Sequence, residues 1–178
     1  MPLELKPFRL PDQWRSENNK DQHSPRLFIK NTSDLDLPIS GGWGYSVEDC
    51  VVIDKNDSSV DQNAPFNGID IEYKFVEKRI YAELILFRKP DDAFSGITWD
   101  LKCQKLDVIE EQMFDVLEFT VTAFRDEDWE FLKNEWEENS AFSDDEEGKK
   151  THLNKRALCS CFYETQFYFD ITGSFGQH

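Results

Sequence analysis

Alternating apolar and polar positions predict β-strands along much of the chain. The clearest case is a pair of stretches, 96–107 and 114–125, joined by a short polar connection at 108–113. Within the second stretch, every other residue is apolar: Leu117, Phe119, Val121 and Ala123. Two alternating stretches with so short a connection predict a long antiparallel hairpin.

Shorter patterns extend the predicted sheet. We expect further strands at 26–30, 50–54, 69–75, 82–88 and 157–171. The last range is longer than the usual strand of ~3–10 residues, so a bend or bulge is expected near Glu164. Residues 77–81 fit a helix as well as a strand, and their assignment stays open.

One range predicts an amphipathic helix, at about 126–139. Asp126 suits the N-cap position, and the acidic residues after it favour the positive end of a helix dipole. Trp129, Leu132 and Trp136 share one apolar stripe. A single clear helix among many strands predicts the α+β class, with a predominantly antiparallel sheet.

The domain organisation follows from composition. Residues 1–25 are polar and interrupted by prolines, so we expect an irregular N-terminal arm. Residues 26–178 are expected to form a single α+β domain, with a mobile acidic linker at 140–150. The chain has 178 residues and 25 aromatic side chains (15 Phe, 5 Tyr and 5 Trp), which is enough for a substantial core.

Hydropathy and cysteine usage bear on localisation. No run of 18 apolar residues is present, so no membrane span is predicted. The first ten residues lack the apolar region of a secretory signal. The four cysteines form no C-x-x-C pair and lie in or beside apolar runs. These features predict free thiols in a cytoplasmic protein.

Charge is the most informative feature of the sequence. The 36 acidic and 20 basic side chains give a net charge of −16. The 22 residues 126–147 hold 11 of the acids and only one base, Lys133. Such a chain is repelled by phosphate backbones, so direct nucleic-acid binding is not expected. A localised negative charge of this kind either serves solubility alone or steers the chain toward a basic protein partner.

Motifs for catalysis are sparse. Of His23, His152 and His178, only His152 is a candidate for catalysis or metal binding, and no histidine pair has a metal-site spacing. We therefore predict no enzyme, cofactor or metal site. Two alternatives stay open: a metal-dependent hydrolase using carboxylates with His152, and a non-catalytic adaptor that binds a cellular protein through an exposed sheet edge.

The sequence gives more evidence for a partner-binding surface than for catalysis. On the predicted helix, Phe131 lies within an acidic face, where it can contact a partner or pack beneath a neighbouring segment. The Gly-rich loop at 40–45 is either a tight turn that packs Trp43 onto the sheet or an exposed aromatic loop. The predicted partner-binding residues are Trp43, Tyr45, Glu48, Asp49, Glu127, Glu130, Phe131, Glu138, Asp144, Asp145, Glu146 and Glu147.

Three stretches carry a family resemblance: 38–46 with Glu48 and Asp49, 75–81, and 122–124. Together they resemble small acidic bacterial immunity proteins of polymorphic toxin and contact-dependent growth inhibition systems. The resemblance implies a cytoplasmic protein that binds one toxin, often a basic nuclease domain, and covers its active site or substrate-binding surface. It implies no catalytic residue and no particular architecture.

Overall fold

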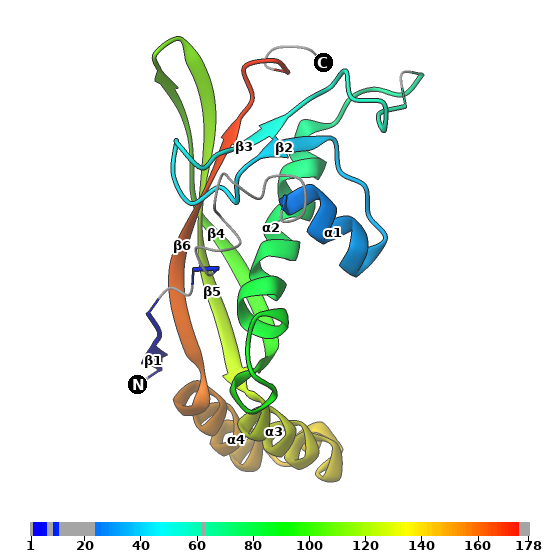
Figure 1. The fold of residues 1–178 in the computed structure, drawn as a ribbon. Coiled ribbons are helices and arrows are strands. Elements are labelled where there is room, and N and C mark those ends of the chain that lie inside the picture. The colour runs from blue at the N-terminus through cyan, green and yellow to red at the C-terminus, as the bar shows by residue number, and fades with distance from the viewer. Residues whose placement is uncertain (1, 7–8, 11–23, 62, 175–178) are drawn as a thin grey trace. The chain divides into compact units, whose positions relative to one another are not determined.

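A computed structural model describes residues 2–6, 9–10, 24–61 and 63–174 (Figure 1). The predicted α+β class is confirmed: helices accompany a six-stranded, mostly antiparallel sheet. The strands are β1 (Leu3–Glu4), β2 (Ile39–Gly41), β3 (Val51–Ile53), β4 (Phe94–Ile109), β5 (Gln112–Arg125) and β6 (Cys161–Asp170). The α-helices are α1 (Pro25–Ser33), α2 (Gly68–Tyr81), α3 (Asp126–Glu138) and α4 (Glu146–Cys159).

The strand order in the sheet is β2-β3-β6-β5-β4, and β1 pairs in parallel with β6. The predicted hairpin is confirmed as β4 and β5. Its turn is tighter than expected, because Glu110 and Glu111 both adopt positive φ, of 50° and 70°. Two central residues with positive φ are the geometry of the type I′ turn that matches the twist of a hairpin.

Residue contacts divide the chain into two compact units. The first contains Leu84–Asp100 and Phe119–Thr165, together with β1. The second contains Arg9–Glu83, Leu101–Glu118 and the C-terminal part from Gln166. We refer to them as unit 1 and unit 2. The strands β4, β5 and β6 each contribute one part to unit 1 and the other part to unit 2.

The prediction of a strand at 69–75 is wrong, because these residues lie in helix α2. The range 77–81, whose assignment was open, belongs to the same helix. Asn67 caps the helix by accepting a hydrogen bond from the backbone of Asp70 (3.1 Å). The alternation misled because its residues do not share one face: Ile69 is exposed, whereas Phe75 is fully buried. Phe75 packs edge-on against Phe169 of β6, which anchors α2 on the strands of unit 2.

Two more predicted strands are helical. The range 26–30 lies in α1, where the Ser24 side chain accepts from the backbone of Leu27 and Pro25 occupies the first turn. The range 82–88 begins with a π-helix, Ala82–Leu86, that continues α2. For α1, an N-cap serine followed by proline is a helix-start signal, and it outweighs the β-propensity of Leu27, Phe28 and Ile29.

The C-terminal third is also more helical than predicted. The expected linker at 140–150 is a 3-10 turn, Ser140–Phe142, followed by the start of α4. Helix α4 also takes the first residues of the expected strand at 157–171, so that β6 begins only at Cys161. The predicted strand at 50–54 is confirmed as β3.

The predicted N-terminal arm at 1–25 falls largely outside the described residues, as do His23 and His178. Within it, Leu3 and Glu4 form β1, and Pro25 begins α1. All four cysteines are free thiols. In the described part of the chain, none of the helices combines the length and apolar character needed to cross a membrane.

Candidate functional site

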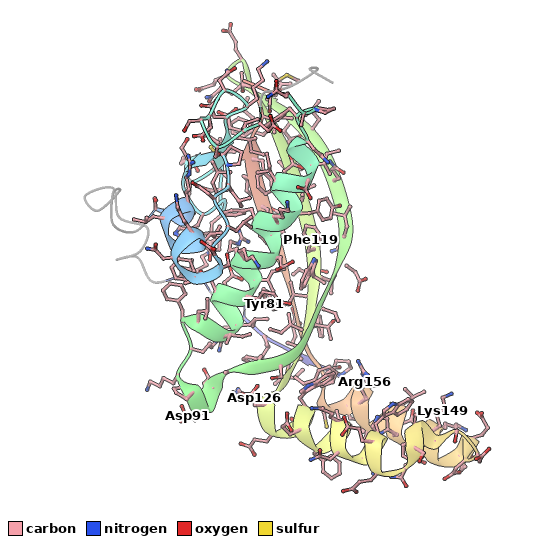
Figure 2. All side chains as sticks on the ribbon, turned by 90° about the vertical axis from the view of Figure 1, so that its right-hand side faces the viewer. Tyr81, Asp91, Phe119, Asp126, Lys149 and Arg156 are labelled. Atoms are coloured by element: carbon pink, nitrogen blue, oxygen red, sulfur yellow. The ribbon has the colours of Figure 1, made fainter. Side chains whose placement is uncertain are left out.

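The candidate site lies on the helical hairpin of α3 and α4 in unit 1. The predicted helix is confirmed as α3. In Figure 2, α3 and α4 lie side by side, with Arg156 near the start of α3 at Asp126 and Lys149 toward the opposite end. Leu132 of α3 and His152 of α4, each 3% exposed, are buried where the two helices meet. Several α3 side chains outside this interface are exposed.

One of these faces is acidic. Phe131 is 57% exposed, and the predicted carboxylates Glu127, Glu130 and Glu138 are exposed as well. The Lys155 ammonium lies 5.7 Å from the centre of the Phe131 ring and supports it from α4. The alternative in which Phe131 packs beneath a neighbouring segment is therefore wrong. We call these four α3 residues the acidic face.

The second group of predicted acidic residues, 144–147, lies at the start of helix α4. Asp145 caps α4, because its carboxylate accepts a hydrogen bond from the backbone of Gly148 (2.9 Å). Glu146 and Glu147 form the first turn, where their charge stabilises the helix dipole. Together with Asp144 they are exposed. These carboxylates are thus held by a helix N-terminus and not by a mobile linker.

His152 joins the two helices. Its Nδ1 lies 2.7 Å from Oε2 of Glu135, and Lys155 pairs with the other oxygen of that carboxylate. The two partners hold the pKa of Glu135 below its ordinary value, with the Lys155 hydrogen bond as the larger cause. The His152 ring also contacts Trp136, at 5.1 Å. Across the described ranges, no cluster of three or more His, Cys, Asp or Glu side chains is arranged to hold a metal ion.

The Gly-rich loop belongs to unit 2 and packs inward. Trp43 is 1% exposed and Tyr45 is 9% exposed, so the prediction that both rings contact a partner is wrong. Gly41 allows the turn, since its φ is +84° and a Cβ there would lie 2.4 Å from the Cys50 carbonyl oxygen. Of the predicted loop carboxylates, Glu48 is exposed and Asp49 is half-buried.

A buried ion pair fixes this loop against α2. The Arg79 guanidinium, fully buried, donates to the carbonyl oxygens of Trp43 (2.9 Å) and Gly44 (3.1 Å). It also pairs with Glu83, whose carboxylate accepts from the Tyr45 hydroxyl (2.6 Å). Burial, more than the charge of Glu83, raises the Tyr45 pKa far above its ordinary value. These contacts give the Gly-rich loop a structural role within unit 2.

A pair of buried carboxyl groups was not predicted. Glu72 of α2 is 3% exposed and Asp115 of β5 is 8% exposed. Within the part of the chain that the structure describes, Oε2 of Glu72 and Oδ1 of Asp115 have no hydrogen-bond partner, while Gln104 donates to the other oxygen of Asp115 (2.6 Å). Among 36 acidic residues, the spacing of these two along the sequence carries no signal, because only the folded chain brings them within electrostatic range of each other.

Comparisons of the chain with protein-family models, with curated proteins and with solved structures found no match.

Proposed function

We propose that this chain is an immunity protein that binds a basic antibacterial toxin domain, such as a nuclease, and covers its active site or substrate-binding surface. The acidic face of α3 is the main support for this proposal. An exposed aromatic ring within a rim of carboxylates combines a site for burial with charges that select a cationic partner.

Electrostatics supports a role in recognition. The net charge of −16 attracts a basic protein over a distance of several ångströms, and clustered charge can raise association rates by ~10–10³. Carboxylates on a rigid helix suit the phosphate-binding surface of a nuclease, because they occupy cationic sites that phosphates would otherwise fill. Four free thiols are consistent with the cytoplasm, where such a protein would meet an incoming toxin.

The two acidic groups contribute in different ways. The acidic face supplies both an aromatic contact and charge, so changes there should alter complex lifetime as well as association. The residues 144–147 at the start of α4 supply charge on a fixed helix terminus and should chiefly affect the association rate.

Matched charge reversal tests the proposal. The partner is the basic toxin domain that co-purifies with the chain from its native cells and whose activity disappears on binding. Glu127→Lys/Glu138→Lys changes the charge of the acidic face by the same amount as Glu110→Lys/Glu111→Lys changes that of the β4–β5 turn. All four side chains are exposed. We expect slower association at low salt for the first variant only, and a smaller difference at high salt. Equal effects of both variants would contradict a specific role for α3.

A further inference from the structure

A pocket of about 300 Å³ lies on another side of the α3–α4 hairpin, within unit 1. At about 100° per residue, its α3 residues fall across the helix from Phe131. The pocket is therefore distinct from the acidic face. Its lining residues are Trp129, Leu132, Lys133, Trp136, His152, Leu153 and Arg156.

Packing holds the aromatic walls of this pocket in place. Trp129 contacts the Phe124 ring of β5, at a centroid distance of 5.3 Å. Gly96 of β4 lies close to the six-membered ring of the same indole: a Cβ added at Gly96 would lie 2.4 Å from Cε3 of Trp129. Trp136 packs against Phe142, at 5.8 Å. Rings fixed from behind in this way form a pocket that exists before a ligand arrives.

The pocket also carries two cations without carboxylate partners. Neither Lys133 nor Arg156 forms a hydrogen bond or ion pair through its side chain within the described residues. Glu130 and Glu137 lie one helical turn from Lys133, yet neither pairs with it. Arg156 instead stacks over Trp129, at 5.5 Å. Both side chains are exposed and line the same apolar pocket, so their charged groups are available to a ligand at its rim.

We propose that this pocket binds a small organic anion that has an apolar body and a single acidic group. The indoles and leucines would enclose the body, while Lys133 and Arg156 would bind the carboxylate or an equivalent oxyanion. The volume lies at the lower end of the ~300–1,000 Å³ typical of ligand pockets, which suits a small molecule. Charge complementarity distinguishes this ligand from a neutral apolar one.

This inference goes beyond the proposed function, because it concerns a different surface and a different class of ligand. Toxin binding through the acidic face requires neither Lys133 nor Arg156. The proposed function and the pocket can therefore fail independently of each other, and the experiment for the pocket uses no toxin.

Octanoate and 1-octanol are the probes, because they share an alkyl chain and differ in charge. Binding to the full chain is measured by calorimetry or by the NMR signals of the indole N–H groups. We expect octanoate to bind at least about tenfold more tightly than octanol. Lys133→Gln/Arg156→Gln should remove that preference and leave octanol binding unchanged. The matched control, Lys149→Gln/Lys150→Gln, makes the same charge change on α4 at residues that do not line the pocket.

A third variant tests the location. Leu153 is 49% exposed, so Leu153→Trp can narrow the pocket without disturbing the core, and it should weaken both ligands. Equal affinities for octanoate and octanol, or no binding of either at millimolar concentration, would overturn the proposal. So would an equal loss of octanoate affinity in the control variant, or unchanged binding in Leu153→Trp.

Discussion

The buried carboxyl pair gives the chain a stability that depends on pH. Burial raises the pKa of Glu72 to about 8, and the nearby charge of Asp115 adds to this shift. Burial also raises the Asp115 pKa, although the Gln104 hydrogen bond opposes that change. A carboxyl with a raised pKa favours folding while it is protonated. The stabilisation is therefore fully present below the unfolded pKa and is lost as the pH rises through the folded one.

The magnitude follows from the two pKa values of Glu72. The ordinary value is 4.5 and the folded value is about 8, so the affected range lies between them. At 1.36 kcal/mol for each pKa unit, the wild type should lose on the order of 4–5 kcal/mol over this range. Asp36, Asp57 and Asp92 have lowered pKa values and act with the opposite sign, at more acidic pH.

Glu72→Gln should remove most of this loss, because the amide is neutral at every pH. We expect the variant to exceed the wild type in free energy of unfolding by several kcal/mol near pH 8, and by little near pH 5. Glu77→Gln is the matched control on α2: its carboxylate pairs at the surface with Lys78, so a change within about 0.5 kcal/mol is expected.

Urea unfolding at several pH values measures these free energies, with the slope against urea checked for constancy. Parallel pH profiles for the wild type and Glu72→Gln would contradict this prediction. They would mean that Glu72 has no raised pKa in the folded chain, and that its carboxylate has access to solvent or to a cation.

Two further predictions concern the helical hairpin. Asp145→Ala should lower the free energy of unfolding by about 0.5–2 kcal/mol, since it removes the cap on Gly148, whereas Asp144→Ala should have little effect; urea unfolding compares them. Gly96→Ala should destabilise by at least about 1 kcal/mol, because φ there is +57° and the new Cβ would collide with Trp129. Its tryptophan fluorescence should shift as Trp129 moves, and unchanged fluorescence with unchanged stability would contradict the packing.

The elements predicted correctly are those whose signals are local. The β4–β5 hairpin alternates over many residues, and α3 combines an acidic first turn with an apolar stripe. Helix α4 lacks such a stripe: His152 is the one side chain that it buries, so its sequence resembles a linker. The sequence of helix α2 alternates between apolar and polar residues, which is the pattern of a strand. The packing of Phe75 on Phe169 stabilises the helix instead, and this contact is not visible in the sequence.

The candidate site also contains residues that a local pattern predicts and residues that depend on tertiary contacts. Phe131 stands out in the sequence because an aromatic residue interrupts an acidic helical face, and its exposure follows from the helical period. The burial of Trp43 and Tyr45 depends on Arg79, which comes from a different element far along the chain. The Glu72–Asp115 pair and the pocket likewise require tertiary contacts that no local pattern encodes.

Titration of the co-purifying toxin domain with this chain, read as the toxin's remaining activity, tests directly whether the chain neutralises a toxin. We expect complete loss of activity at a one-to-one ratio. Phe131→Ala should dissociate faster and neutralise less well, while Ile69→Ala, which removes a comparably exposed apolar side chain from α2, should match the wild type. Undiminished toxin activity at a molar excess of the chain, or equal behaviour of the two variants, would contradict the claim.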